Sequence, residues 1–233
     1  MPAKNALKTY TEGGYYHVYN RGVNKRTIFK DAQDSTVFLS YLKTYLLAKD
    51  VDMLNKMLSS PDSSPKEKNH ALNLLHLNNF QGRITLLAYC LMSNHFHFLI
   101  SQTGRQDMET FMKSLMTRYL KYFNYRHGRV GPLFQGRYKA VLISSDEQLL
   151  YLTRYIHRNP FELPETLRDQ QPSSYRVYLG QMKQEWVQPS VVLANFAPSG
   201  FNSYQSFVES TAADHEVQAA ALLAPVSIDG PAS

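Results

Sequence analysis

Two apolar segments in the middle of the chain constrain its fold more than any other sequence feature. They run from Ile84 to Cys90 and from His95 to Ile100, and only a short connection around Met92-Ser93-Asn94 separates them. Their length and spacing predict an antiparallel β-hairpin. Because side chains alternate along a strand, His95 and His97 share one face, and the apolar side chains of Phe96, Phe98 and Ile100 share the other. We therefore expect one face of this hairpin to pack in a core while the other face carries the imidazoles.

The segments on either side of the hairpin predict a complete small sheet. We expect a strand at 15–20 that ends at Arg21-Gly22, a helix capped by Asp34 that runs to about Lys49, a long helix over 108–127, a strand over 137–143, and a last core helix capped by Asp146 and ended by Pro160. This order, βαββαβ plus a helix, matches the split βαβ arrangement. The predicted fold class is α+β, with a ferredoxin-like antiparallel sheet and helices.

We expect one catalytic domain at 8–170 that carries an internal insertion and a C-terminal extension. Residues 51–79 contain a Ser- and Pro-rich loop between two apolar patches, which predicts an insertion with two short helices. We expect a C-terminal extension over 171–233, with short helices within 175–179, 191–196 and 204–208. The composition of the last 20 or so residues, rich in Ala, Ser and Pro, predicts a mobile tail.

Net charge, cysteine content and hydropathy indicate what kind of partner the protein binds and where in the cell it is located. The chain has 233 residues and a net charge of +6, which favours a polyanionic partner. A single cysteine, Cys90, excludes an internal disulfide, and the chain opens without a signal-peptide pattern, so we expect a cytoplasmic location. No apolar segment approaches the roughly 20 residues that a membrane-spanning helix needs. We expect no membrane partner.

Charge placement points to nucleic acid. The segment from Thr110 to Ser145 contains no Asp or Glu, whereas it holds seven Lys and Arg residues with aromatic residues between them. Cations together with stacking surfaces are what single-stranded nucleic acids contact. Some of these aromatic residues lie on a predicted apolar helix stripe, so Tyr125, Phe134 and Tyr138 are the better stacking candidates. A merely solvated basic face is the alternative.

The histidine pair and the last helix supply the candidate chemistry. His95 and His97, about 7 Å apart on one strand face, can converge on a metal ion, although they can equally be half-buried histidines satisfied by hydrogen bonds. On the last helix, Tyr155 and Asn159 lie one turn apart on one face. Tyr155 can be a nucleophile and Asn159 an oxygen ligand. The structural alternative is that Tyr155 lies at the edge of the core and Asn159 caps the helix end.

Four motifs together resemble the IS200-like, single-tyrosine (Y1) transposase family, in particular its REP-associated tyrosine transposase branch. They are Tyr16-His17-Val18-Tyr19-Asn20-Arg21-Gly22, Met92-Ser93-Asn94-His95-Phe96-His97, Phe134-Gln135-Gly136-Arg137-Tyr138-Lys139 and Tyr155-Ile156-His157-Arg158-Asn159-Pro160. The resemblance covers about residues 8–180. The insertion at 51–79 and the C-terminal extension depart from it.

The resemblance implies an HUH endonuclease fold and a mechanism. By this likeness, His95 and His97 are metal ligands, Asn159 is the third ligand, and Tyr155 attacks a phosphate of single-stranded DNA with Mg²⁺ or Mn²⁺ bound. The products are a 5′-phosphotyrosine link and a free 3′-hydroxyl. The implied substrate is single-stranded DNA with a hairpin, either a REP-like repeat or a palindrome at the end of an element, and many relatives are homodimers. The candidate DNA-binding residues are Arg21, Lys25, Arg26, Lys113, Arg118, Lys121, Arg126, Arg129, Phe134, Gln135, Arg137, Tyr138, Lys139 and Arg158.

Two other functions fit the same sequence. A non-catalytic nucleic-acid-binding regulator that retains the transposase fold would need the basic and aromatic segment but not the histidines or the tyrosine. A metal-dependent phosphodiesterase that uses water as the nucleophile would release free DNA ends, with no protein attached.

Overall fold

A computed structural model describes residues 10–210 of the chain, so the predicted mobile tail lies outside the described residues. The core elements follow the expected order: β1 (Tyr15–Arg21), α1 (Ala32–Leu46), β2 (Ile84–Met92), β3 (His95–Gln102), α4 (Asp107–Arg126), β4 (Lys139–Ile143) and α5 (Asp146–Arg158). Two short helices, α2 (Val51–Ser59) and α3 (Pro65–His76), lie between α1 and β2. The expected α+β class is confirmed.

The sheet has the predicted split βαβ topology. Its strand order is β2-β3-β1-β4, and every neighbouring pair is antiparallel. The hairpin formed by β2 and β3 pairs Cys90 with His97 and Met92 with His95. The first strand lies on the other side of β3 and pairs Tyr19 with His97. Both histidines therefore lie on an interior strand, with a neighbouring strand on each side.

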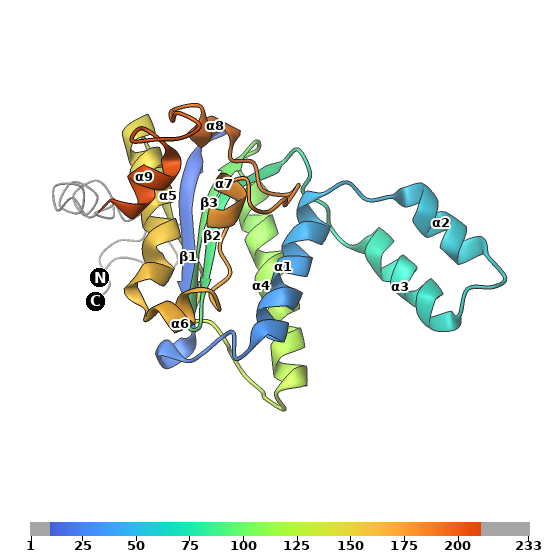
Figure 1. Cartoon of the computed structure of the whole chain (residues 1–233). Helices are drawn as coiled ribbons and strands as arrows, with labels where there is room; N and C mark the ends of the chain where they lie inside the picture. Colours follow the sequence, from blue (N-terminus) through green and yellow to red (C-terminus); the bar gives the residue numbers. More distant parts are fainter. Residues whose placement is uncertain (1–9, 211–233) are drawn as a thin grey trace.

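Helices cover the two faces of the sheet (Figure 1). The crossover helices α1 and α4 pack on one face, where Phe96, Phe98 and Ile100 join the larger hydrophobic cluster. The last core helix α5 packs on the other face, where Leu99 of β3 joins a second cluster with Leu152 and other α5 side chains. Strand alternation thus sends Phe96, Phe98 and Ile100 of β3 to α1 and α4 and puts its histidines on the opposite face, as the sequence predicted; this opposite face is the one that α5 covers.

The segment after residue 170 is packed onto the core. It contains the short helices α7 (Tyr175–Tyr178), α8 (Ser190–Leu193) and α9 (Tyr204–Glu209), which correspond to the three short helices expected there. Tyr178, Val192 and Tyr204 belong to the second hydrophobic cluster. The backbone of this segment also bonds to the outer edge of β2, with Ser174 N donating to Tyr89 O at 3.0 Å. This pairing covers an edge strand that would otherwise expose unpaired backbone groups.

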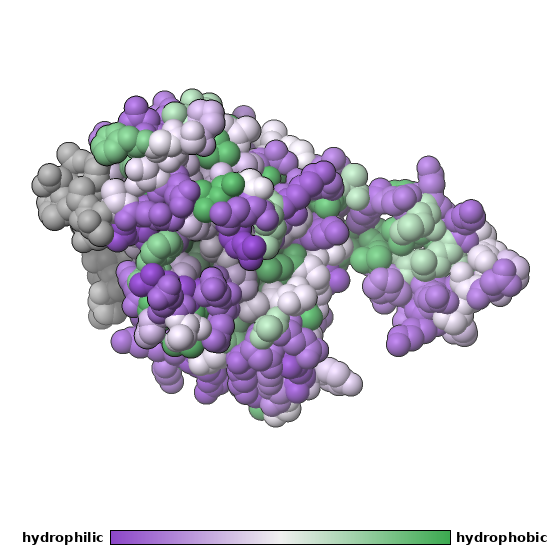
Figure 2. All heavy atoms as spheres, in the orientation of Figure 1, coloured by the Kyte–Doolittle hydropathy of each residue, from purple (hydrophilic) through white to green (hydrophobic). Residues whose placement is uncertain are grey.

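The α2–α3 pair projects away from the sheet (Figure 1). Each helix begins at a side-chain cap: the Asp50 carboxylate accepts from Met53 N, and Ser64 forms a reciprocal capping box with Glu67. Leu54 and Ala71 are the buried residues of the two helices. On the visible surface of the pair, hydrophobic side chains gather in the middle and hydrophilic side chains lie around them (Figure 2). The two helices expected within 51–79 are confirmed.

Several predicted element boundaries differ from the structure by a few residues, among them the end of the first helix, which lies at Leu46 rather than at about Lys49. Asp31, three residues before the predicted Asp34, caps α1, and Ser145 rather than Asp146 caps α5. Asp34 is instead a buried acceptor for Lys30 N and the His127 imidazole. Strand β4 begins at Lys139 rather than at 137, because the preceding loop bonds to the end of β1, where Gln135 N donates to Arg21 O at 2.8 Å.

None of the helices described is both long and apolar enough to cross a membrane.

Candidate active site

The turn between β2 and β3 is held by the loop that follows β1. Gly22 N donates to Asn94 O at 2.9 Å, and Ile28 N and Phe29 N both donate to Ser93 O. A Cβ atom on Gly22 would overlap with the carbonyl oxygen of Arg26, so this close backbone approach needs a glycine. The loop thereby fixes the backbone next to the first histidine of β3.

The two sequence-predicted histidines lie together beneath α5. Their ring centroids are 5.0 Å apart, with the ring planes nearly perpendicular. His95 Nε2 lies 3.5 Å from Asn159 Oδ1, and His95 Nδ1 lies 2.6 Å from Asn94 Oδ1. The structure therefore brings His95, His97 and Asn159 to one place, although they are far apart in the chain.

The hydrogen bonds of His95 and Asn159 show which of their side-chain atoms keep a free lone pair. Asn94 Oδ1 can only accept, so His95 Nδ1 carries the hydrogen, and Nε2 keeps its lone pair. Asn159 Nδ2 donates to Tyr155 O at 2.8 Å, which leaves Asn159 Oδ1 as an acceptor as well. Two acceptors therefore face each other across 3.5 Å. A cation between them would bind both atoms.

Tyr155 lies over the histidines. Its ring centroid is 5.3 Å from that of His97, and the rings meet edge to face. The side chain is 36% exposed, whereas Tyr151, Tyr119 and Tyr138, the other tyrosines weighed for this role, are buried. Tyr119 and Tyr138 also use their hydroxyls in buried hydrogen bonds. Of these four tyrosines, Tyr155 is the exposed one.

Sequence reasoning missed a third histidine. His17 of β1 lies on the same sheet face, and its Nε2 is 2.8 Å from His97 Nδ1. The two rings are stacked at 5.1 Å, and the ring of Tyr155 lies 6.0 Å from that of His17. His17 stands in the Tyr16-His17-Val18 motif, but only the pairing of β1 with β3 shows that it meets His97. The parity of β1 alone could have placed it on the polar face.

Burial keeps the site uncharged. It lowers the pKa of His17 to about 3 and holds the pKa of His97 well below its ordinary value. The pKa of His95 is lowered as well, chiefly by burial. Burial raises the pKa of the Tyr155 phenol, and the Asn159 side chain acts in the opposite direction. At neutral pH the site therefore presents neutral imidazoles and a protonated phenol.

This donor set fits a divalent ion that takes further ligands from another molecule. Among residues 10–210, no three His, Cys, Asp or Glu side chains form a possible metal site; the third candidate ligand here is an amide, and His17 bonds directly to His97. Ligands at about 2.1 Å from one ion lie about 3 Å apart at right angles, so the 3.5 Å between His95 Nε2 and Asn159 Oδ1 is compatible with a shared ion. The set carries no negative charge. A further, anionic ligand would have to supply it.

A basic recess opens beside His95. It has a volume of about 590 Å³ and is formed by the ends of β1 and β3 and the loop before β4. Arg21, Lys25 and Lys139 line it, and no Asp or Glu does. Arg21 Nε donates to Gln135 Oε1, which joins two of the sequence-predicted DNA-binding residues. This recess offers cations within the same pocket as His95.

Other predicted DNA-binding residues lie on the opposite side of the sheet. Lys113, Arg118 and Lys121 of α4 line a cleft of about 1020 Å³ between α3 and α4. The Arg118 guanidinium lies 3.9 Å from the ring centroid of Tyr41, and its Nη1 is buried without a hydrogen-bond partner in the described structure. The basic stretch of the sequence is therefore divided between two surfaces.

Several predicted DNA contacts are used within the protein. Phe134 and Tyr138 are 7% and 8% exposed and lie in the larger hydrophobic cluster, so both rings pack within the protein in this structure. Arg126 binds the carboxylates of Asp31 and Asp34. Tyr125, in contrast, is 92% exposed. Of the remaining predicted DNA-binding residues, Arg158 donates to backbone carbonyls of the C-terminal segment and Arg129 donates to Asn124. Arg26 and Arg137 are exposed.

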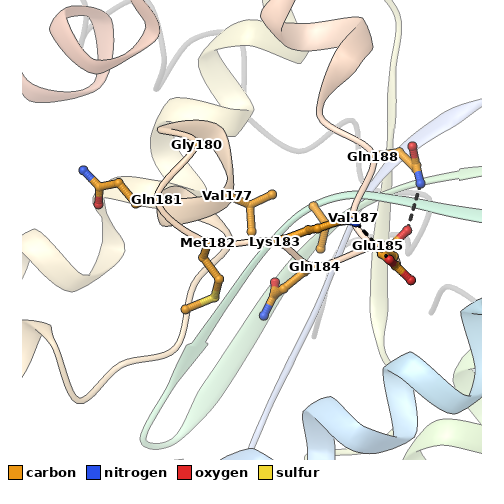
Figure 3. Close-up of a pocket in the computed structure, with 9 residues that line it drawn as sticks. All are labelled: Val177, Gly180, Gln181, Met182, Lys183, Gln184, Glu185, Val187 and Gln188. Atoms are coloured by element: carbon orange, nitrogen blue, oxygen red, sulfur yellow. Dashed lines mark hydrogen bonds and ion pairs between the residues drawn. The ribbon is translucent and has the colours of Figure 1, made fainter.

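A further cavity lies away from this chemistry. It is formed by α7 and the loop after it, has a volume of about 640 Å³, and is lined by Val177, Gly180–Glu185, Val187 and Gln188 (Figure 3). Lys183 and Glu185 form an ion pair at its rim. None of the predicted site residues lines this cavity.

Comparisons with known proteins agree with the motifs. The family model described as IS200-like transposase matches residues 65–159. Among solved structures, the chain is similar to a REP-associated tyrosine transposase bound to a REP hairpin, with a TM-score of 0.44 and 12% sequence identity, over 79% of this chain and 97% of that one. No curated protein is significantly similar in sequence. The resemblance predicted from the motifs is thus confirmed for residues 65–159, the segment that holds His95, His97, Tyr155 and Asn159 and that matches the IS200-like transposase family.

Proposed function

We propose that this protein is a metal-dependent single-strand DNA endonuclease and strand transferase, with a transposase-like activity at DNA hairpins. The observation that carries the proposal is the pair of acceptors, His95 Nε2 and Asn159 Oδ1, which face each other beneath the exposed ring of Tyr155. The match of this segment to a transposase family supports the same reading.

The proposed reaction requires the protein chiefly to place the Tyr155 hydroxyl next to the scissile phosphate. The phenolic oxygen of Tyr155 attacks the scissile phosphorus, a Tyr155 O–P bond forms, and the P–O3′ bond breaks. The phenolic hydrogen is lost, and the leaving 3′ oxygen takes up a proton, so the products are a 5′-phosphotyrosine and a free 3′-hydroxyl. One phosphoester bond to Tyr155 replaces the one broken in the DNA. A 3′-hydroxyl can therefore attack the phosphotyrosine in the reverse direction and rejoin the DNA without an external energy source.

A bound metal ion would offset the low reactivity of the Tyr155 phenol. The raised pKa of Tyr155 makes it a poor nucleophile at neutral pH. Bound by His95, His97 and Asn159, Mg²⁺ or Mn²⁺ would polarise the scissile phosphate and favour loss of the phenolic proton. We expect Mn²⁺ to bind more tightly than Mg²⁺, because two of the three protein ligands are imidazoles and Mg²⁺ prefers oxygen.

We propose that the two basic surfaces hold different parts of the DNA. The recess of Arg21, Lys25 and Lys139 adjoins His95, so it is the place for phosphates that flank the cut. The cleft of Lys113, Arg118 and Lys121 lies across the sheet and would contact the hairpin stem or its flanks. The hairpin substrate and a homodimeric state rest on the motif resemblance.

A covalent-adduct assay tests the proposed activity. Purified protein is incubated with Mn²⁺ or Mg²⁺ and a library of 3′-labelled single-stranded oligonucleotides that carry hairpins with varied flanks. We expect a labelled protein band in a denaturing gel, because a 5′-phosphotyrosine retains the 3′ fragment. Tyr155→Phe should abolish the band. Tyr151→Phe, which removes the hydroxyl one helical turn earlier, is the matched control and should retain it.

The outcomes separate the candidate functions. An adduct that persists in Tyr155→Phe would show that another residue is the nucleophile. Metal-dependent cleavage without any attached protein would identify a phosphodiesterase that uses water. Hairpin binding that does not change with metal, and that leads to no cleavage of any oligonucleotide, would favour a non-catalytic regulator.

A further inference from the structure

The contact between His17 and His97 constrains the hydrogen atoms of both rings. The bond joins His17 Nε2 to His97 Nδ1 at 2.8 Å, and both side chains are buried. A separation of 2.8 Å is that of a hydrogen bond, so one of these two ring nitrogen atoms donates and the other accepts. A neutral imidazole has one N–H and one lone pair, and one hydrogen therefore lies between the two nitrogen atoms.

Only two arrangements satisfy this contact. If His97 Nδ1 donates, its Nε2 has a free lone pair and can bind a metal ion. If His17 Nε2 donates, His97 must carry its own hydrogen on Nε2, and that nitrogen cannot bind a metal ion. The tautomer of His17 thus determines whether His97 is competent as a ligand.

The surroundings of the pair fix its geometry. Tyr19 packs on both rings, with centroids 4.8 Å from His17 and 5.7 Å from His97, and the Tyr155 ring lies edge to face with His97 at 5.3 Å. The pairing of β1 with β3 places Tyr19 directly opposite His97 and His17 one step diagonally away. Metal-binding histidines almost always donate their second ring nitrogen to a carboxylate, a carbonyl or water. Here, a histidine nitrogen occupies that position.

We infer that His17 is a positioning residue of the metal site in the proposed function: it accepts a hydrogen bond from His97 Nδ1 and so holds His97 with Nε2 free for the ion. His17 is not itself a ligand in this arrangement, because its Nε2 is used by His97. Its role is to select one tautomer and one ring orientation of the ligand.

Metal affinity, rather than DNA cleavage, provides the test. Free Mn²⁺ is titrated against the full-length protein and followed by electron paramagnetic resonance, without DNA. His17→Phe keeps a ring of similar size in the stack but cannot accept a hydrogen bond, and we expect its Mn²⁺ affinity to fall by about 10- to 100-fold. His17→Gln places an amide oxygen at a reach similar to Nε2, and its affinity should remain close to that of the wild-type protein.

A matched control separates this role from general packing. His157 is also a buried histidine with a lowered pKa, but it bonds to Tyr204 and Ser174 within the second hydrophobic cluster. His157→Phe should leave Mn²⁺ affinity unchanged, whatever it does to stability. Thermal unfolding of each variant shows that the protein compared is folded.

A measurement on the wild-type protein covers the case in which a variant does not fold. Long-range ¹H–¹⁵N correlation spectra of the histidine rings report which nitrogen carries the hydrogen, and we expect it on Nδ1 of His97. Wild-type affinity in folded His17→Phe, or a hydrogen on Nε2 of His97, would overturn the inference while leaving the proposed function in place. A loss in His17→Gln as large as that in His17→Phe would overturn the acceptor role. A wild-type protein that binds no Mn²⁺ would overturn the metal site together with the role of His17.

Discussion

The basic recess beside His95 makes a quantitative prediction about DNA binding. Lys25→Ala and Lys139→Ala together remove two of its three cations and leave the Arg21–Gln135 contact in place. If each lysine neutralises one phosphate of a single strand, each contributes about 0.7 to the slope of log K against log salt. The double variant should therefore have a slope smaller by about 1.4.

The difference in salt slope also gives the expected loss of DNA affinity in the double variant. A slope difference of about 1.4 corresponds to roughly 25-fold weaker binding at about 0.1 M salt and roughly fourfold at about 0.4 M. The loss should be largest at low salt, because released counterions supply this part of the binding free energy. A change of specific base contacts would instead give a loss that varies little with salt.

Fluorescence anisotropy with a short unstructured oligonucleotide is the assay, in a Tyr155→Phe background that prevents cleavage. The matched control is Lys113→Ala with Lys121→Ala, which removes the same charge from the cleft between α3 and α4. We expect the control to bind the short strand like the parent protein. An unchanged slope in Lys25→Ala/Lys139→Ala, or an equal change in both double variants, would refute the assignment of the scissile strand to the recess.

Two further predictions concern stability. His157 has a pKa lowered to about 3 in the folded protein against 6.5 when exposed, so the unfolded chain binds its proton first, and the stability of the neutral buried ring is lost as pH falls from 6.5 toward 3. The destabilisation of His157→Phe at pH 7, measured by urea unfolding, should therefore shrink by about 2 kcal/mol at pH 5; an equal penalty at both pH values contradicts this account. Gly22→Ala should destabilise the protein by about 1–3 kcal/mol because its Cβ would overlap with the carbonyl oxygen of Arg26. A variant with the stability of the wild type would show that this backbone contact is loose.

Much of the fold could be predicted because the periodic signals were strong. Alternation in β3 assigned its histidines and phenylalanines to opposite faces, and helical spacing located α4 and α5 within a few residues. The caps of α1 and α5 were less predictable, because Asp31 and Asp34, or Ser145 and Asp146, are chemically similar candidates at nearby positions. Only the backbone path selects between them.

The aromatic residues show a second limit. Phe134 and Tyr138 lie beyond the periodic apolar stripe of the long helix, so the local sequence favoured exposed rings there. The structure buries both, because their loop bonds to the end of β1 and turns the rings into the larger core. Tyr125, on the solvent face of α4, is exposed as expected. Burial of a loop residue depends on contacts that are distant in the chain.

The sequence by itself determined the identity of the candidate chemistry: two histidines on one strand face, a tyrosine and an asparagine one helical turn apart, and a long segment of cations without acids. These features follow from local geometry and composition. Tertiary structure alone decided that His95 and Asn159 present facing acceptors, that His17 bonds His97, and that the cations divide between two surfaces. The reason is physical: strand and helix periods fix which face a side chain occupies, whereas strand register and the packing of α5 on the sheet fix which faces meet.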